Sequence, residues 1–290
     1  MRPPSCSVSL QLLLRVAVIF VVSPVAVPGQ AVSAADTGRC ELRVESALYA
    51  DGGSEPVASS LALFHEGVTW DFLESPVGKV REIVLHDPAR ERIVVIDPVR
   101  QRKTQVEAIQ LERLSVSLAA WTRGSEDRLV RWAGGPDFTT GFTEDEGRLE
   151  LAGPRVRYAV AFEEAPSREA AETYRRFADM AILLKALLQP GGIPPFPRLA
   201  VNRRLEEAGA LPAEVSLEID PKLSRLAARP ARLRCVHQTH PRLLSGDLER
   251  IEQARAHLAT ARHVDLAEFV VSEDEGIKRG DDERSPGPGS

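Results

Sequence analysis

One short segment near the end of the chain holds residue types that bind metal ions or attack substrates. Residues 235–240 read CVHQTH, which places a thiol and two imidazoles close together. In a strand, Cys235 and His237 share one face and His240 points to the other, because successive side chains alternate. A closed zinc site takes four ligands, so a metal-dependent hydrolase would need further ligands from elsewhere, such as His65, His86 or a carboxylate. The alternative, which we favour, is a covered strand that binds no metal.

A second pattern, an Asp-Pro pair followed by basic residues, occurs twice. The copies are residues 87–90 (DPAR) and 97–100 (DPVR), and Arg102 and Lys103 follow the second. Clustered cations could meet an anionic head group or an acidic patch of a partner protein. Asp-Pro also starts type I turns, so the same residues could be the solvated ends of hairpins. We favour the hairpin interpretation.

Large apolar side chains at alternating strand positions offer a third site, suited to an uncharged ligand. If their strands lie in one curved sheet, they form a continuous apolar surface. Covered by helices, this surface is an ordinary core; left partly unfilled, it is a hollow that takes acyl chains. The residues are Leu61, Leu63, Trp70, Phe72, Tyr158 and Phe162.

The motifs of several common catalytic sites are missing. The sequence contains no Gly-x-Ser-x-Gly elbow, phosphate-binding loop, dinucleotide fingerprint or His-Glu-x-x-His pair. We therefore expect no catalytic residues and no cofactor.

The spacing of apolar side chains predicts the elements that carry these residues. From residue 40 to residue 108 the apolar period is two, with Gly, Pro and Asp between the runs, which indicates an antiparallel meander. Later runs have the period of a helix. The predicted strands are 42–49, 60–65, 68–73, 79–85, 92–96, 103–106, 138–142, 149–151, 155–162, 214–219 and 231–239. The predicted helices are 111–123, 125–132, 167–189, 198–208, 245–258 and a short one after Asp265.

The first thirty-odd residues have the features of a secretory signal peptide. Arg2 and Arg15 supply positive charge, residues 16–27 (VAVIFVVSPVAV) are almost wholly apolar, and small side chains precede Ala35. A membrane anchor would need about 20 apolar residues, and this run is shorter and contains a proline. We predict cleavage near Ala34 and export to the periplasm or beyond the cell.

Cleavage leaves one predicted α+β domain, residues 35–271, and an acidic tail, residues 272–290, whose composition indicates disorder. Loss of Arg2 and Arg15 takes the net charge from −5 to −7. An acidic protein is a poor candidate for nucleic-acid binding, which depends on neutralising phosphates. We expect contact with a membrane to be transient at most.

Two cysteines, Cys40 and Cys235, remain after cleavage. In an oxidising compartment such a pair is often a disulfide, and this one would join the first strand to a late one. Two separate buried thiols are the alternative, and the sequence leaves both open.

The stretch from residue 68 to residue 106 (VTWDFLESP…ERIVVIDPVRQRKT) resembles the central hairpins of the periplasmic lipoprotein carriers, a half-barrel superfamily. The resemblance lies in a WxF strand, an IDP turn and a charged strand, and it covers about the first half of the mature chain. It implies a lipid or lipoprotein acyl chain held in the hollow of the half-barrel under helices. Residues 194–199 (PPFPRL) are also similar to a segment of other exported proteins, which implies no activity.

We therefore predict an α+β fold, a strongly curved, half-barrel-like antiparallel meander with helices packed on one face. The predicted function is a non-enzymatic carrier for a lipid or acyl ligand in the cell envelope. The alternatives are a structural or interaction protein with a filled sheet core, and a metal-dependent hydrolase that uses Cys235, His237 and His240.

Overall fold

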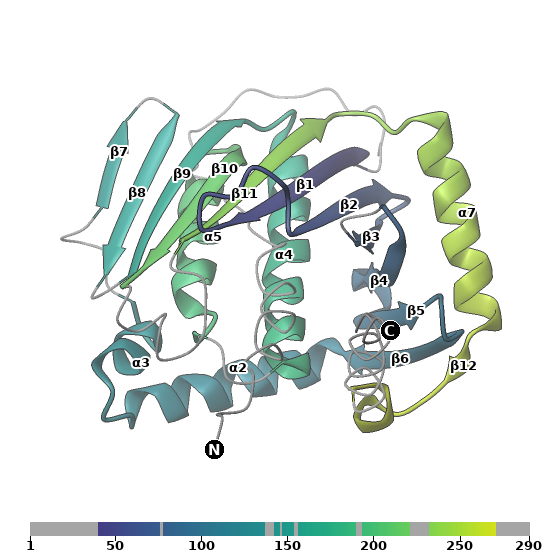
Figure 1. The fold of residues 1–290 in the computed structure, drawn as a ribbon, viewed down its shortest axis with the longest axis horizontal. Helices are drawn as coiled ribbons and strands as arrows, with labels where there is room; N and C mark the ends of the chain where they lie inside the picture. The colour runs from purple at the N-terminus through teal and green to yellow at the C-terminus, as the bar shows by residue number, and fades with distance from the viewer. Residues whose placement is uncertain are drawn as a thin grey trace, which may run out of the picture.

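The computed structural model describes residues 40–75, 78–136, 142–145, 147–153, 156–189, 193–220 and 232–270. The predicted signal peptide and acidic tail lie outside these ranges. The described chain has an α+β fold with one open twelve-stranded sheet (Figure 1), in the order β12-β6-β5-β4-β3-β2-β1-β11-β10-β9-β8-β7. All neighbouring strands are antiparallel except β12 and β6, which are parallel.

The elements agree closely with the predicted ones. The predicted strand 138–142 overlaps β7 only at Phe142, and residues 137–141 lie outside the described ranges. The strands are β1 Leu42–Ala50, β2 Ala58–His65, β3 Val68–Glu74, β4 Val80–Asp87, β5 Arg92–Asp97, β6 Arg102–Glu107, β7 Phe142–Asp145, β8 Arg148–Gly153, β9 Val156–Glu164, β10 Ala210–Ile219, β11 Arg232–His240 and β12 Arg262–His263. The helices are η1 Pro88–Arg90, α2 Ala108–Arg123, α3 Arg128–Ala133, α4 Arg168–Leu188, α5 Phe196–Glu207 and α7 Ser245–Thr260.

Strands β1 to β6 form the predicted meander, in which each strand pairs antiparallel with the next. Glu66 and Gly67, between β2 and β3, both have positive φ angles, of 54° and 78°. Two such residues make the turn whose twist matches that of the flanking strands. The later strands join this meander through β11, which pairs with β1 so that Cys235 lies opposite Leu48.

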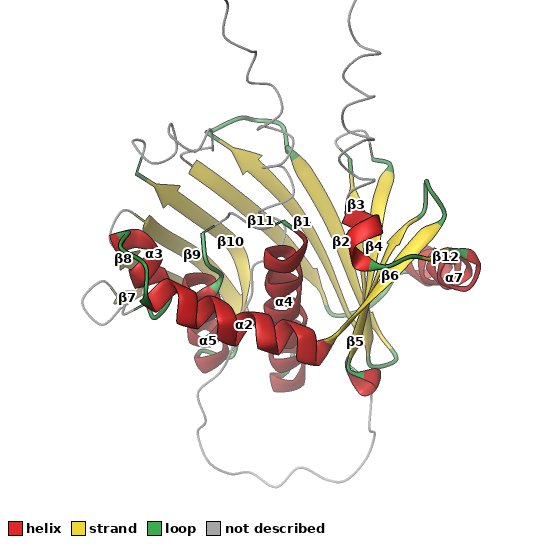
Figure 2. Ribbon diagram, turned by 90° about the horizontal axis from the view of Figure 1, so that it is seen from below, coloured by secondary structure: helices red, strands yellow, loops and turns green. Residues whose placement is uncertain are grey.

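Helices cover both faces of the sheet, whereas the sequence predicted helices on one face only (Figure 2). On one side, which we call the α4 face, Phe64 packs 5.4 Å from the ring of Phe177 in α4. On the other, the α7 face, Trp70 and Phe72 pack with Ile251 of α7. The physical reason is that the central strands carry apolar side chains on both faces. Residues 61–64 (LALF) and 93–96 (IVVI) are buried without interruption. Strands of this kind need cover on both faces.

The C-terminal residues close one end of the α4 face. β12, a two-residue strand that the sequence did not predict, adds to the edge at β6. Residues 266–270 are helical, as predicted, and Phe269 is 1% exposed under the guanidinium of Arg102, 4.7 Å from the ring centre. Across the described ranges, no helix has the length and apolarity needed to cross a membrane.

Candidate functional site

The strongest candidate site is a small pocket between the α4 face and the second half of α4. We call it the Asp71–His86 pocket. It has a volume of about 40 Å³, which is room for a small polar group. The sheet contributes Asp71, Leu73, Glu82, Val84 and His86, and the other wall consists of Ala181, Leu184, Lys185 and Leu188 of α4 and of Gln189, which follows it.

Strand alternation brings the two polar side chains at its base together. On β3, Asp71 alternates with Trp70 and Phe72, so it points to the α4 face while they point to the α7 face. The register sets Asp71 opposite Val84 and sets Thr69 opposite His86. Asp71 and His86 are therefore diagonal neighbours on adjacent strands, within reach of one ligand.

The carboxyl of Asp71 is 1% exposed, and neither oxygen has a hydrogen-bond partner among the described residues. Burial and, to a smaller extent, the charge of Glu82 raise its pKa to about 8, against the opposing field of Lys185. Removing a carboxyl from water disfavours its charged form. At neutral pH Asp71 is therefore mostly an uncharged carboxylic acid.

The imidazole of His86 is buried in the same way. Neither ring nitrogen has a partner in the described part of the chain, and the ring packs edge-on against Phe177 at 4.8 Å. Burial lowers its pKa to about 3, so the ring is neutral at physiological pH. Buried polar atoms in folded proteins are almost always paired, and two unpaired groups at the base of one pocket point to a ligand.

A second polar cluster lies elsewhere on the α4 face, against α5. Ser46 and His237 hydrogen-bond across β1 and β11 at 2.8 Å. Arg198 of α5 is buried there; burial lowers its pKa to about 9, and the fields of Tyr158 and Tyr174 oppose the shift. We place the site at the Asp71–His86 pocket, because there a cavity adjoins the buried polar groups.

The segment 235–240 does not form a metal site in the structure. Cys235 and His237 are buried on one face of β11, as predicted, while the side chain of His240 is 51% exposed beside Glu45. Within the described ranges, no group of three or more His, Cys, Asp or Glu side chains is placed to hold a metal ion.

Of the two alternatives that the sequence left open for Cys40 and Cys235, the structure has the separate thiols: both cysteines are free. Cys235 lies opposite Leu48, whereas Cys40 precedes Leu42 at the start of β1. Leu42 and Leu48 are already about 20 Å apart along an extended strand. The Cα atoms of a disulfide lie within about 7 Å of each other.

The six residues of the predicted apolar surface are not brought together. Leu61, Leu63, Trp70 and Phe72 form one cluster under α7, and Trp70 and Phe72 are only 2% and 3% exposed. Tyr158 belongs to the other cluster, and Phe162 packs against it. These two clusters lie on opposite faces of the sheet.

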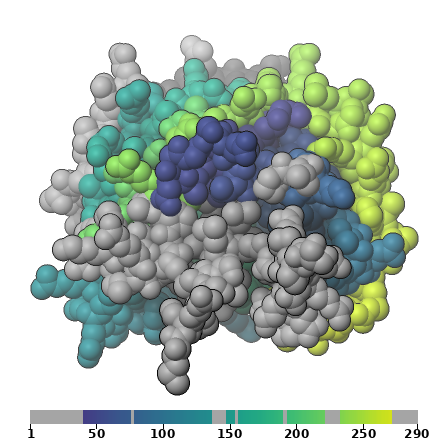
Figure 3. Space-filling model, in the orientation of Figure 1, coloured from purple at the N-terminus to yellow at the C-terminus, as the bar shows by residue number. Residues whose placement is uncertain are grey.

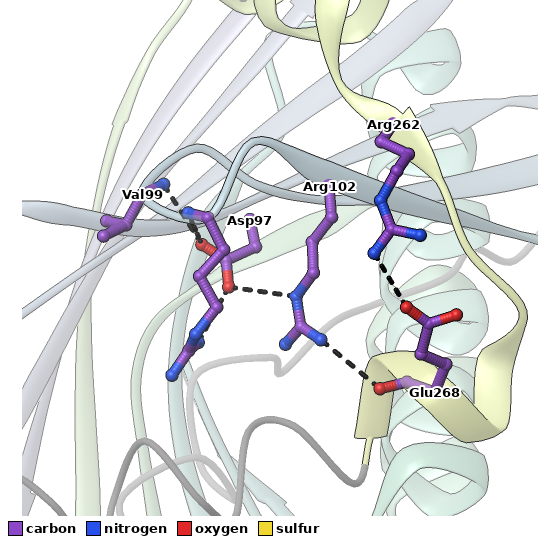
Figure 4. A network of polar contacts seen from close by, with 6 residues as sticks. Asp97, Val99, Arg102, Arg262 and Glu268 are labelled. Carbon is purple, nitrogen blue, oxygen red and sulfur yellow. Dashed lines mark hydrogen bonds and ion pairs between the residues drawn. The ribbon is translucent and has the colours of Figure 1, made fainter.

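The Asp-Pro pairs form hairpin ends, but the turns are not simply solvated. Asp97 is buried and accepts hydrogen bonds from Arg100 at 2.8 Å and Arg102 at 3.4 Å (Figure 4). Asp87 does the same with Arg90 and Arg92. Burial opposes ionisation of Asp97, but the hydrogen bonds from Arg100 outweigh it and hold the pKa of Asp97 below its ordinary value. These cations are therefore committed to internal pairs.

Arg102 also ties the C-terminal residues to the sheet. Its guanidinium donates to the backbone carbonyl of Glu268 at 3.3 Å, and Arg262 donates to the carboxylate of Glu268 at 2.8 Å (Figure 4). The second Asp-Pro turn thus has a structural role in closing this end of the α4 face.

An open groove of about 750 Å³ lies on the α7 face, where β1 and β11 meet the start of α7. On the side seen in Figure 3, the purple residues of β1 lie beside the green and yellow residues of β11 and α7. Its main charges are paired: Arg43 contacts Asp247 at 3.0 Å and Arg250 contacts Glu74 at 2.8 Å. The groove therefore offers no distinct chemistry.

Sequence reasoning missed Asp71 and named His86 only as a possible further ligand of a metal site. Alternation alone assigns Asp71 to the solvent side once Trp70 and Phe72 are taken as the core side. The available signal was the run of apolar residues at both parities in neighbouring strands, which indicates that both faces are buried. A charged residue inside such a strand is then a buried polar group.

Compared with known proteins, the chain matches no family model and no curated protein.

Proposed function

We propose that this protein is a non-enzymatic carrier or binding protein for an apolar ligand, a lipid or acyl chain, which acts in the cell envelope after export. The observation that carries the proposal is the Asp71–His86 pocket: two buried polar groups without partners below walls of Leu73, Val84 and Leu184. Ligand sites commonly combine an apolar lining with a few placed polar groups. The signal-peptide features at residues 1–34 support the export step.

A pocket of about 40 Å³ takes only the end of such a ligand. The remaining chain would lie between α4 and the sheet, in place of contacts that Leu184 and Ala181 make in the closed form. Moving α4 outward hydrates Asp71 and His86. Each buried unpaired polar group costs about 1–3 kcal/mol, so relieving two of them lowers the cost of opening.

The finer description of the fold belongs to the same proposal: a strongly curved, half-barrel-like sheet with α4 and α5 in its hollow. The view in Figure 2, where the sheet bends around α4 and the outermost strands stay apart, supports it. The resemblance of residues 68–106 to the lipoprotein carriers points the same way. A half-barrel with a helical cover is suited to admitting a chain, because the cover can move without breaking the sheet.

Binding of a pyrene-labelled alkyl chain to the purified chain from residue 35 onward tests this proposal. Wild-type protein should bind the probe saturably. Ala181→Val puts two methyl groups into the pocket wall and should weaken binding, while Ala120→Val, an exposed alanine of α2, should leave it unchanged. Circular dichroism confirms that each variant is folded. Folded wild-type protein that takes up no probe would overturn the proposal.

One observation favours the second candidate, a structural or interaction protein with a filled core. Trp70 and Phe72 are only 2% and 3% exposed and pack with Ile251 of α7, so the part of the α7 face that they occupy is filled. This candidate predicts that no alkyl probe binds and that Ala181→Val changes only stability. The same titration therefore separates the two functions.

A further inference from the structure

The groups at the base of the Asp71–His86 pocket define which head group it can accept. An uncharged carboxylic acid donates one hydrogen bond and accepts others, and a neutral imidazole has one donor and one acceptor nitrogen. Both side chains are nine-tenths or more buried, and both lack partners within the described residues. A matching ligand group must therefore donate and accept at one atom.

A hydroxyl group meets this requirement. Its oxygen can accept from the acid of Asp71 while its proton is donated to the free nitrogen of His86. An ammonium group only donates, and would leave the N–H of His86 without an acceptor. A carboxylate only accepts, so it would leave the free nitrogen of His86 without a donor, and its negative charge would lie close to Glu82.

The charges around the pocket point in the same direction. Glu82 and Lys185 carry opposite charges and both line the pocket, so their fields oppose each other there. Burying an isolated charge costs far more free energy than burying a hydrogen-bonded polar group. A neutral head group is therefore preferred over either ion.

The apolar walls of the pocket indicate what kind of chain the hydroxyl group carries. Leu73 and Val84 of the sheet face Leu184 and Leu188 of α4 across the pocket. A chain attached to the hydroxyl would leave the base along these side chains. The pocket then selects an amphiphile with a hydroxylated end and an apolar chain.

We propose that the Asp71–His86 pocket recognises the neutral hydroxyl head group of an amphiphile, such as a long-chain alcohol or a glycerol ester, in preference to an amine or a carboxylate. This inference rests on the carrier function proposed above and names its ligand class. Asp71 and His86 are the recognising residues, and the wall of α4 holds the start of the chain.

Calorimetric titration with 1-decanol, decylamine and decanoate, which share one chain length, tests the inference. Measured near pH 6.5, where Asp71 keeps its proton, decanol should bind roughly tenfold tighter than either ion, which is the effect of one well-placed buried hydrogen bond. Asp71→Leu should weaken decanol binding roughly tenfold and leave the two ions unaffected.

Two further variants distinguish a loss of binding from a loss of folding. Asp71→Asn retains a donor and an acceptor, so it should hold most of the decanol affinity even if Asp71→Leu folds poorly. Thr104→Val, a buried polar side chain on β6 away from the pocket, is the matched control and should change nothing. Circular dichroism and urea unfolding establish that each protein is folded.

The outcomes separate the two proposals. Equal binding of all three decyl compounds would overturn the head-group inference and leave the carrier function standing. Tightest binding of decylamine, or decanol binding that Asp71→Leu does not change, would also overturn it. If folded wild-type protein binds none of the three, both proposals fall.

Discussion

Replacing Asp71 by asparagine should change how the stability of this protein depends on pH. The amide has the shape of the protonated carboxyl but cannot titrate. In the folded protein, burial and Glu82 raise the pKa of Asp71 from 3.8 to about 8, against the opposing field of Lys185. In the unfolded chain the same carboxyl loses its proton near its ordinary pKa.

The sign of the effect follows from counting protons. Between about pH 4 and pH 8 the folded state holds a proton at Asp71 that the unfolded state has lost, so the free energy of unfolding falls as the pH rises. The slope is about 1.4 kcal/mol per pH unit, and the whole interval amounts to at most about 6 kcal/mol. Asp71→Asn removes this pH dependence. The free energy of unfolding of the variant should therefore increase steadily relative to that of the wild type up to about pH 8.

Urea unfolding followed by circular dichroism at intervals from pH 4.5 to pH 8.5 measures this difference. All other titrating groups are common to both proteins, so their contributions largely cancel in the difference between wild type and variant. A stability difference that stays constant with pH would refute the claim that Asp71 is a buried neutral acid. A variant that loses stability relative to the wild type as the pH rises would refute it as well.

Three further predictions follow from other contacts. Burial lowers the pKa of His86 from 6.5 to about 3, so wild type should lose stability relative to His86→Phe as the pH falls below 6.5; a pH-independent difference in urea unfolding contradicts this. Asp97→Ala leaves the buried Arg102 without its carboxylate and should lower the free energy of unfolding by about 3 kcal/mol; a loss under 1 kcal/mol in the same assay is the contrary result. Unfolded, unreduced protein should show reactive thiols at both Cys40 and Cys235, whereas native Cys235, whose pKa burial raises to about 12, should react slowly.

Much of the fold could be predicted from sequence because local signals agree with it. The period-two runs and their turn residues correspond to β1 through β6 with boundaries close to the predicted ones. Ser167, predicted to begin the longest helix, caps α4 by accepting from the backbone of Ala170 at 3.0 Å. These features depend on neighbouring residues, so the sequence alone reports them.

The assignment of faces could not be predicted in the same way. Alternation sorts the residues of one strand into two sets, but it does not say which set of the next strand lies beside them. Tyr158 and Trp70 were placed on one surface for this reason, and the register sets them on opposite faces. The position of α7 over Trp70 depends on tertiary packing. The periodicity of the helix predicts which side of α7 is buried, but not which face of the sheet covers it.

The Asp71–His86 pocket shows the same limit. Asp71 becomes a buried acid only because α4, about a hundred residues later in the chain, covers β3. The sequence left open whether Cys40 and Cys235 form a disulfide, because compartment and cysteine count do not contain the strand register, which places Cys235 opposite Leu48.

The central claim is that the space between α4 and the sheet receives an apolar chain. Native mass spectrometry of the purified chain from residue 35 onward, after incubation with 1-decanol, tests it most directly. The proposed function predicts a one-to-one complex that is depleted in Ala181→Val and retained in Ala120→Val. Folded protein that carries no decanol, or equal complexes in both variants, would contradict it.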